Sequence, residues 1–164
     1  MVIVVWGVTA VGKTTVGKLL AEELGWKFYD ADDFHSPANV EKMPCGIPLT
    51  DEDRRPWLER LRQMIERSLV EEENAVLACS ALKRAYRERL RASEDVKFVF
   101  LRASRARIAE RLQRRHGHFM PATLLDSQFA DLEEPQAGEQ TLTVDVEGTP
   151  DELVKLIKTK LRLG

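Results

Sequence analysis

Residues 7–15 read Gly7-Val8-Thr9-Ala10-Val11-Gly12-Lys13-Thr14-Thr15, and this stretch decides the fold. It fits the pattern of a glycine, four residues and Gly-Lys-Thr, in which the backbone surrounds a phosphate group. An apolar run at residues 2–6 precedes it, and residues 16–24 follow with apolar side chains at helical spacing. Strand, loop and helix in this order are the context that the pattern requires. The alternative, a glycine-rich turn with a surface lysine, explains fewer of these features.

The residue types in this loop suit phosphate chemistry. Gly7 and Gly12 permit backbone dihedrals that a side chain would oppose, so that successive N–H groups can point at one anion. The helix that follows adds the positive end of its dipole. Lys13 brings a mobile positive charge to the β- and γ-phosphates, and Thr14 brings a hydroxyl for Mg²⁺. The sequence therefore predicts that all nine residues of the stretch bind a nucleotide.

The composition is typical of a soluble globular domain. The 164 residues are 43% hydrophobic and 32% charged, and the formal net charge is −2. Because this charge creates no global positive field, neither nucleic acid nor a membrane is expected as a partner. No apolar run approaches the ~20 residues that span a bilayer, and the chain opens on a strand without a leader signal. Cys45 and Cys79 make no disulfide framework, so we expect a cytoplasmic protein.

Apolar runs typical of strands alternate with helical patterns along the chain. This alternation indicates an α/β fold, with a parallel sheet that helices cover on both faces. After the first strand, we expect strands at residues 27–30, 75–80, 96–101 and 141–146, with 75–80 in the centre of the sheet. We expect helices at residues 13–24, 37–43, 51–69, 81–91, 104–115, 121–132 and 150–161. No linker divides the chain, so we expect one domain.

Two carboxylates follow the second expected strand. Asp30 and Asp32 lie two residues apart, so an extended chain would point both side chains to one side. Ligands of α/β sheets bind at the carboxyl ends of the strands. Beside a phosphate loop, one carboxylate suits Mg²⁺ or its water shell, and the other suits a substrate hydroxyl. A solvated acidic turn is the alternative interpretation.

Three further groups of polar residues are candidates for binding anions. Arg54 lies near the start of the long helix, and Ser80 and Lys83 follow another strand. The densest basic stretch contains Arg111 and Arg115 and is followed by a glycine, a candidate hinge. Such a stretch suits an arginine-bearing cover that excludes water from a reaction. A solvated helix end is the alternative.

These residues resemble a known family, the gluconate kinases of the small P-loop kinase group, which are related to shikimate kinases and nucleoside-monophosphate kinases. The resemblance extends over nearly the whole chain. Besides the phosphate loop, the matching blocks are Tyr29-Asp30-Ala31-Asp32-Asp33-Phe34-His35, Asn39-Val40-Glu41-Lys42-Met43, Gly46-Ile47-Pro48-Leu49-Thr50-Asp51-Glu52-Asp53-Arg54-Arg55-Pro56-Trp57-Leu58, Cys79-Ser80-Ala81-Leu82-Lys83-Arg84-Ala85-Tyr86-Arg87, Arg115-His116-Gly117-His118-Phe119-Met120 and Leu125-Asp126-Ser127-Gln128-Phe129.

The resemblance implies a P-loop kinase fold with a five-stranded parallel sheet and a mobile lid. It implies that D-gluconate is phosphorylated on its terminal hydroxyl to 6-phosphogluconate, with ATP and Mg²⁺ as cofactors. We expect a substrate-binding helical region at about residues 34–60 and the lid at about residues 111–132. Members of such families are often homodimers, although no interface is recognisable in this sequence.

The motifs and the resemblance together lead to a hypothesis for the site. Lys13 holds the phosphates, Thr14 binds Mg²⁺, and Asp30 acts on the water shell of the metal. Asp32 accepts a hydrogen bond from the attacking hydroxyl and takes its proton late, because phosphoryl transfer depends mostly on positioning and charge stabilisation. Arg54 binds the carboxylate of gluconate, which its planar fork suits. The lid residues that close over ATP are Arg111 and Arg115. Further candidates for contacts with the sugar acid are His35, Lys42, Ser80 and Lys83.

Three alternatives stay open at this point. A kinase for another small hydroxy acid, such as shikimate, fits the same motifs, although shikimate kinases carry a glycine run where Cys79-Ser80-Ala81 stands here. A nucleoside-monophosphate kinase needs a pocket that recognises the base, for which no signature is visible. A P-loop switch protein or a nucleic-acid-binding ATPase belongs to a different class, which the balanced charge and the polar region around Asp32 and Arg54 disfavour.

Overall fold

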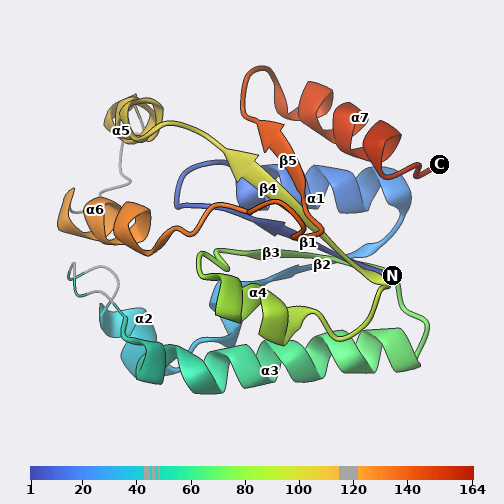
Figure 1. Cartoon of the computed structure of the whole chain (residues 1–164), viewed down its shortest axis with the longest axis horizontal. Coiled ribbons are helices and arrows are strands. Elements are labelled where there is room, and N and C mark those ends of the chain that lie inside the picture. Colours follow the sequence, from blue (N-terminus) through green and yellow to red (C-terminus); the bar gives the residue numbers. More distant parts are fainter. Residues whose placement is uncertain (43–44, 46, 48, 115–121) are drawn as a thin grey trace.

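The structure is a computed structural model that describes residues 1–42, 45, 47, 49–114 and 122–164 (Figure 1). Its centre is a five-stranded parallel sheet in the order β2-β3-β1-β4-β5. The strands are β1 (Val2–Trp6), β2 (Lys27–Asp30), β3 (Ala75–Cys79), β4 (Val96–Arg102) and β5 (Leu142–Asp145). The helices are α1 (Lys13–Leu24), the 3₁₀ helix η1 (Ala31–Phe34), α2 (Pro37–Lys42), α3 (Asp51–Val70), α4 (Arg84–Leu90), α5 (Arg105–Arg114), α6 (Ala122–Asp131) and α7 (Pro150–Lys160).

The expected α/β fold with a five-stranded parallel sheet is confirmed, but the expected centre of the sheet is wrong. β1, and not residues 75–80, is the central strand. Val4 of β1 pairs with Leu77 on one side and with Phe98 on the other. Because β1 and β3 are both apolar and fully buried, their composition could not tell the middle strand from its neighbour. The phosphate loop therefore leaves the sheet where the strand order reverses, the usual place for a ligand.

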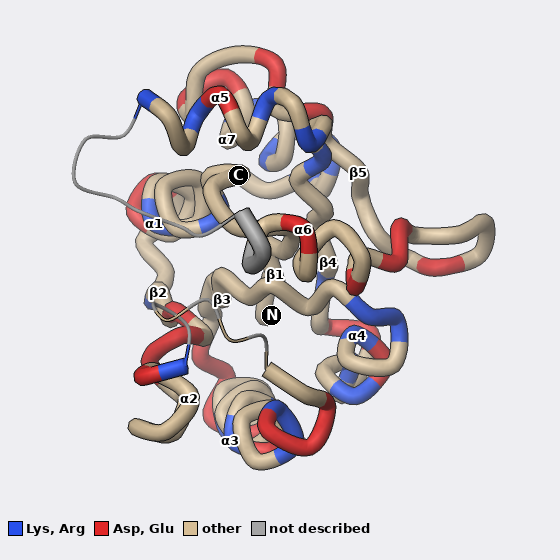
Figure 2. The backbone as a smooth tube through the Cα atoms, turned by 90° about the vertical axis from the view of Figure 1, so that its left-hand side faces the viewer, with Lys and Arg blue, Asp and Glu red and all other residues tan. Residues whose placement is uncertain are grey.

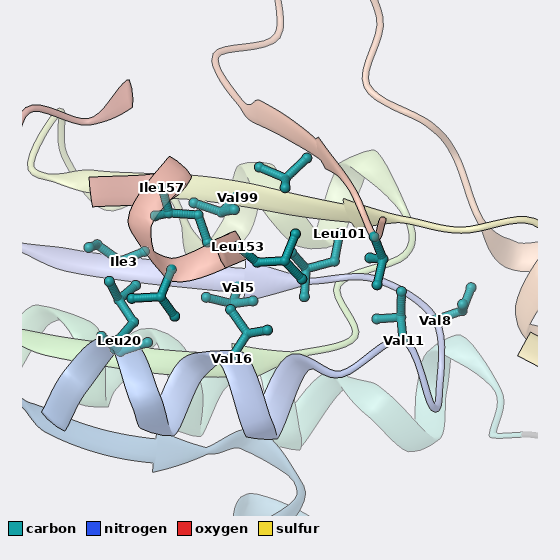
Figure 3. Packing of buried hydrophobic residues seen from close by; sticks show 14 of the residues in the cluster. Ile3, Val5, Val8, Val11, Val16, Leu20, Val99, Leu101, Leu153 and Ile157 are labelled. Carbon is teal, nitrogen blue, oxygen red and sulfur yellow. The ribbon is translucent and has the colours of Figure 1, made fainter. Parts of the chain in front are cut away.

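Helices cover both faces of the sheet (Figure 1). Alternate residues of β1 supply the two cores, since successive strand residues point to opposite faces. On one face, Ile3 packs in a cluster with Val16 of α1 and Ile157 of α7 (Figure 3). On the other face, Trp6 packs in a cluster with Leu61 of α3. Burying such large apolar side chains contributes about 1.5–3 kcal/mol each, which holds β1 and the loop after it in place.

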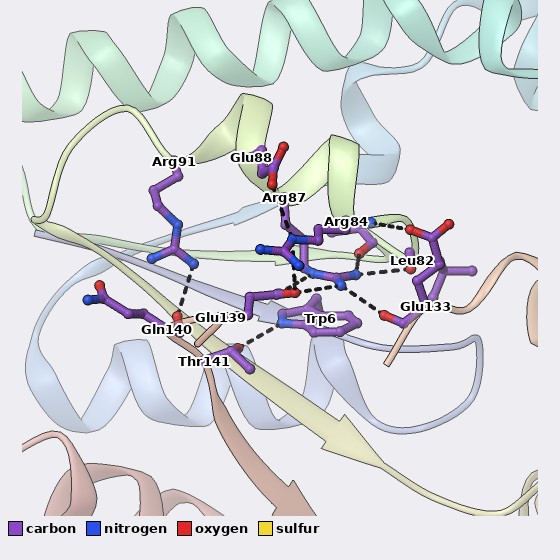
Figure 4. Close-up of polar contacts among 11 residues, drawn as sticks. Trp6, Leu82, Arg84, Arg87, Glu88, Arg91, Glu133, Glu139, Gln140 and Thr141 are labelled. Carbon is purple, nitrogen blue, oxygen red and sulfur yellow. Dashed lines mark hydrogen bonds and ion pairs between the residues drawn. The ribbon is translucent and has the colours of Figure 1, made fainter. Parts of the chain in front are cut away.

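The helix after β3 begins later than the sequence pattern predicts. The pattern predicts a helix over residues 81–91, whereas α4 spans Arg84–Leu90. Ala81 has a φ of 39°, which no right-handed helix allows. The carbonyls of Ala81 and Leu82 accept hydrogen bonds from Nη1 of Arg87 at 2.9 and 3.0 Å (Figure 4). A buried side chain thus binds the carbonyls that would have begun the helix.

The remaining expectations about the chain concern its cysteines and its apolar segments. Cys79 is buried in β3, where desolvation raises the pKa of its thiol to about 12, and Cys45 is exposed. Both of these described cysteines are free thiols, so Cys79 is a core residue, as expected. Within the part of the chain that the structure describes, no helix has the length and apolar character to cross a membrane.

Candidate active site

The phosphate loop lies at the carboxyl edge of the sheet, which faces the viewer in Figure 2. Gly7 has a φ of 151° and Gly12 a φ of 105°, and a side chain would strain both conformations. A Cβ on Gly7 would also lie 2.8 Å from the carbonyl oxygen of Leu101. Ala10 adopts a φ of 60°, in the left-handed region that glycine tolerates best. The expected glycine-dependent turn is therefore present, with one non-glycine residue held in a strained conformation.

The other loop residues divide between the core and the surface. Val8 and Val11 are 2% and 0% exposed, and they fix the loop by packing into the same hydrophobic core as the buried face of α1. Thr15 is exposed in the first turn of α1. The backbone N–H of Thr9 donates to Oε1 of Gln128 on α6 at 2.6 Å. The loop is thus fixed on one side by its valines and on the other by α6.

Lys13 reaches back across the loop. Its Nζ donates to the carbonyl oxygen of Val8 at 2.8 Å. Desolvation by the surrounding protein lowers the pKa of Lys13 below its usual value, and the negative charges of Asp32 and Asp30 oppose this shift. A phosphate anion beside Nζ would restore the stability of the charged form. The glycine-dependent turn, the start of α1 and this lysine therefore fit the phosphates of a nucleotide.

Thr14 and the two carboxylates lie together beside the loop. The hydroxyl of Thr14 donates to Oδ2 of Asp30 at 3.1 Å, and Oδ1 of Asp30 accepts the N–H of Asp32 at 3.0 Å. Asp30 thereby caps η1, so Asp32 lies in a helical turn. The expectation that an extended chain presents both carboxylates is wrong, because the capping bond turns the backbone directly after β2. The two side chains still interact electrostatically.

The carboxylate of Asp32 combines access to water with a perturbed proton affinity. Its residue is exposed at the surface of the site, yet protein atoms surround enough of the carboxylate to raise its pKa. The charge of Asp30 raises this pKa further, and the charge of Lys13 opposes the rise. A carboxylate with these neighbours accepts a proton more readily than an ordinary aspartate does, which suits a late proton acceptor.

Arg111 is the basic residue of α5 that contacts the phosphate loop. Its Nη1 donates to the carbonyl oxygens of Val11 and Ala10 at 3.1 and 3.4 Å. The structure therefore brings Arg111 to the phosphate loop, and its contact with a nucleotide stays a prediction. Arg115, the second lid arginine, lies outside the described residues.

Arg54 and Lys83 belong to one polar cluster between α3 and α4. Nη1 of Arg54 donates to the hydroxyl of Tyr86 at 3.1 Å, and Nη1 and Nη2 both lie 3.3 Å from Oδ2 of Asp131. The hydroxyl of Tyr86 also bonds with Asp51, and Nζ of Lys83 donates to the same carboxylate at 2.8 Å. Two of the predicted substrate residues are thus connected through Tyr86 and Asp51.

Lys42 and Ser80, two further candidates for acceptor contacts, lie outside this cluster. Nζ of Lys42 lies 3.1 Å from both carboxylate oxygens of Asp53, so its charge is already paired near the start of α3. Ser80 follows β3, and its carbonyl accepts the N–H of Gly7 at 3.3 Å. Ser80 therefore lies directly beside the phosphate loop, whereas Lys42 acts mainly on the start of α3.

His35 stacks on Trp57, with ring centroids 4.4 Å apart and an interplanar angle of 8°. Desolvation, and then the positive charges of Arg54 and Arg60, lower the pKa of His35 to about 4. The imidazole is therefore neutral at pH 7. Its Nδ1 is buried and has no hydrogen-bond partner among the described residues.

Gln128 and Asp131 are site residues that the sequence reasoning missed. They lie three residues apart on α6, so they share one face of that helix. Gln128 contacts the phosphate loop, and Asp131 contacts Arg54. The signals in the sequence were the family-like block that contains Gln128 and the spacing of the two residues on an expected helix, since neither contact partner is close in the chain.

A metal ion in this site would take few ligands from the protein. In the described ranges, no group of three or more His, Cys, Asp or Glu side chains could hold a metal ion. Mg²⁺ usually keeps several waters and binds one or two protein oxygens together with substrate phosphates. The adjacent oxygens of Thr14 and Asp30 fit that pattern.

Comparisons with known proteins match this geometry over nearly the whole chain. The family model described as Shikimate kinase matches residues 9–155. The chain is 51% identical to the gluconokinase of Gluconobacter oxydans, over 91% of this chain and 84% of that protein. The crystal structure of a gluconokinase from Sinorhizobium meliloti has a TM-score of 0.86 and 45% identity, covering 98% of this chain and 90% of that one. That of an unliganded sugar kinase from a Janibacter species has a TM-score of 0.92 and 41% identity, covering 99% and 95%.

Proposed function

This chain belongs to the shikimate kinase family, and within it to the gluconokinases, and we propose that it phosphorylates D-gluconate with ATP. The product would be 6-phosphogluconate. The observation that carries this proposal is the 51% sequence identity to a gluconokinase over 91% of the chain. The loop geometry supports it, because Lys13, Thr14 and Asp30 lie where a kinase holds the phosphates of its donor.

The family description alone would also fit shikimate as the acceptor. The relative at 51% identity and the solved structure at 45% identity are both gluconokinases, which favours gluconate. The chain also lacks the glycine run of shikimate kinases at the end of β3, where it has Cys79-Ser80-Ala81. We therefore do not favour shikimate, a nucleoside monophosphate or a switch function.

On the donor side, ATP supplies the phosphoryl group and Mg²⁺ neutralises charge on its phosphates. The backbone of residues 7–15 and Lys13 would bind the phosphates, and the oxygens of Thr14 and Asp30 would hold the metal or its waters. Arg111 lies against the loop carbonyls and is close enough to contact the donor from α5. We propose that Arg115 joins it when residues 111–132 cover the donor.

On the acceptor side, Asp32 orients the attacking hydroxyl and receives its proton. The raised pKa of Asp32 supports this role, since protein atoms and Asp30 stabilise its protonated form. Arg54 binds the carboxylate of gluconate, and Lys83, Ser80, Lys42 and His35 line the acceptor region at about residues 34–60 and after β3. Phosphoryl transfer then depends on holding the hydroxyl in line with the donor.

Three finer expectations belong to this proposal. We propose a cytoplasmic enzyme, because Cys45 and Cys79 are free thiols that a reducing compartment preserves. We propose that it binds no nucleic acid, and a binding signal that fell steeply with salt would argue against this. A homodimer, as in related families, stays a prediction that light scattering can test.

The test is an ADP-release assay with MgATP and a panel of acceptors: D-gluconate, other aldonates, shikimate, nucleoside monophosphates and none. We expect strong turnover with D-gluconate alone. Turnover with a different acceptor would overturn the substrate, and equal ADP release in every well would overturn the kinase assignment. Lys13→Met is the control, because the signal must disappear in this variant if it comes from the phosphate loop.

A further inference from the structure

The arginine assigned to the acceptor contacts a carboxylate of its own chain. Nη1 and Nη2 of Arg54 both point at a single oxygen, Oδ2 of Asp131, at 3.3 Å. The two side chains are partly buried, with 15% of Arg54 and 26% of Asp131 exposed. This is the guanidinium that we assign to the carboxylate of gluconate. Asp131 therefore lies where that carboxylate would bind.

The geometry of this pair is weaker than that of other pairs in the same chain. Arg89 binds both oxygens of Glu59, with Nε at 2.6 Å and Nη2 at 2.7 Å. Charge-assisted bonds of this parallel kind are normally about 2.7–2.9 Å long. Nη1 of Arg54 also donates to the hydroxyl of Tyr86, and its contacts with Asp131 are two long bonds to one oxygen. A free carboxylate that bound both nitrogens in parallel would therefore form the better pair.

Asp131 is also poorly supported by its own helix. It is the last residue of α6, where the negative end of the helix dipole disfavours an acidic side chain. Within α6 as the structure describes it, the last turn contains no basic residue that would compensate. The cations near Asp131 are thus Arg54, with which it is in contact, and Lys83, and both belong to other elements than α6.

We propose that Asp131 is an internal competitor that occupies the carboxylate-binding position of Arg54 until the acceptor displaces it. This inference rests on the proposed function, in which Arg54 binds the carboxylate of gluconate. It makes Asp131 a residue that sets the affinity for the acceptor, because the measured affinity is reduced by the fraction of molecules in which Asp131 holds Arg54.

The experiment measures the Kd of D-gluconate by calorimetry in wild type, Asp131→Asn and Asp145→Asn. The Asp131→Asn change keeps the shape of the side chain and removes its charge, so gluconate should bind about two- to five-fold more tightly, as expected for loss of a partly exposed competing pair. Asp145 forms an ion pair with Arg102 between β5 and β4, and its variant should bind gluconate as wild type does.

A neutral polyol, D-glucitol, distinguishes the loss of competition at Arg54 from a general structural change in the pocket. It has no carboxylate to place on Arg54, so its inhibition constant should not change in Asp131→Asn. Equal tightening of both ligands would indicate a general change in the pocket and would overturn the proposal. Unchanged or weaker gluconate binding would also overturn it, since Asp131 would then be neutral or would position Arg54.

Turnover by the wild type distinguishes a wrong role for Asp131 from a wrong assignment of the kinase function. Wild-type turnover of D-gluconate with MgATP establishes the function independently of Asp131. If turnover is present and Arg54→Met retains the gluconate affinity, both the role of Arg54 and the competition by Asp131 are wrong, while the kinase assignment holds. If turnover is absent, the proposed function itself is wrong.

Discussion

Among single residues, Asp32 carries the sharpest chemical expectation. Three charged neighbours act on its carboxylate: the carboxylates of Asp30 and Asp33 raise its pKa, and the ammonium group of Lys13 lowers it. Surrounding protein atoms and Asp30 raise the pKa of Asp32, whereas Asp30 itself accepts hydrogen bonds from Thr14 and from the backbone of Asp32. The neighbouring carboxylates thus have different surroundings, and the role of Asp32 as a proton acceptor stays a prediction.

Asp32→Asn removes the proton acceptor while keeping the size of the side chain. We expect kcat for gluconate phosphorylation to fall by about 10²–10⁴-fold, the usual contribution of a positioned acid or base, with a much smaller change in the KM for ATP. Steady-state kinetics measure this. Asp95→Asn is the control, because the side chain of Asp95 is exposed and the residue lies just before β4, at the edge of the sheet opposite the phosphate loop. A comparable loss in both variants would contradict the role of Asp32.

His35 should make the stability of the fold depend on pH. Its pKa is lowered to about 4 in the folded chain from an ordinary value of 6.5, so between these values the unfolded chain binds the extra proton and the folded chain does not. Stability from the neutral imidazole is therefore present above pH 6.5 and is lost as the pH falls towards 4. The Tm of wild type should drop more steeply over this window than the Tm of His35→Gln. Parallel curves would mean that His35 titrates normally.

At the scale of elements, the start of α3 positions the acceptor region. The hydroxyl of Thr50 accepts the N–H of Asp53 at 3.0 Å, and the carboxylate of Asp53 accepts the N–H of Thr50 at 3.0 Å, which makes a reciprocal capping box. Arg54 is the next residue of this helix. The cap fixes the first turn of α3, and Arg54 lies in this turn, so the cap determines the position from which the Arg54 side chain extends.

Thr50→Ala removes this cap, and Thr149→Ala removes the equivalent cap of α7, where Thr149 accepts the N–H of Glu152 at 3.2 Å. We expect each change to lower the free energy of unfolding by about 1 kcal/mol, measured by chemical denaturation. Only Thr50→Ala should also raise the KM for gluconate, because only that helix start carries Arg54. An equal effect of both variants on KM would show that the cap of α3 does not position the acceptor site.

Across the whole molecule, Arg87 joins parts of the chain that are distant in sequence. Its guanidinium donates in three directions: Nη1 binds the carbonyls of Ala81 and Leu82, Nη2 binds the carbonyl of Glu133, and Nε and Nη2 bind Glu139 (Figure 4). Its guanidinium also lies 4.0 Å from the ring of Trp6, the residue before the phosphate loop. The ends of β1 and β3 and the segment after α6 are thus held by one side chain.

Arg87→Met should destabilise the fold strongly. It leaves Glu139, whose side chain is only 6% exposed, as a buried charge without its main partner, which costs about 3–5 kcal/mol. Arg89→Met, two residues further on, breaks a pair in which both side chains are nearly half exposed, and should lower the stability far less. Urea denaturation of the two variants measures the difference. Similar losses would show that burial does not set the strength of the Arg87 pair.

Local features of the chain could be predicted from the sequence because they depend on neighbours along the backbone. The phosphate loop, the bounds of most strands and helices, the caps at Thr50 and Thr149, and the family all follow from residues within a few positions of one another or from block-by-block resemblance. Gly7 and Gly12 need no distant partner to adopt their conformations. The alternation of apolar runs with helical patterns likewise indicated a parallel sheet covered on both faces.

Only the tertiary structure decided how these local pieces meet. β1 and β3 are equally buried and apolar, so either could have been the central strand, and β1 is central because it also pairs with β4. The position of Arg87, which pairs with Glu139 52 residues further on, and the contact of Asp131 with Arg54, 77 residues away, depend on hydrogen bonds formed only after folding. Such bonds leave no periodic signal in the sequence, because the distance between their partners along the chain is arbitrary. The sequence by itself therefore determined the chemistry of the phosphate loop, and the packing of α6 determined that Gln128 contacts this loop and Asp131 contacts Arg54.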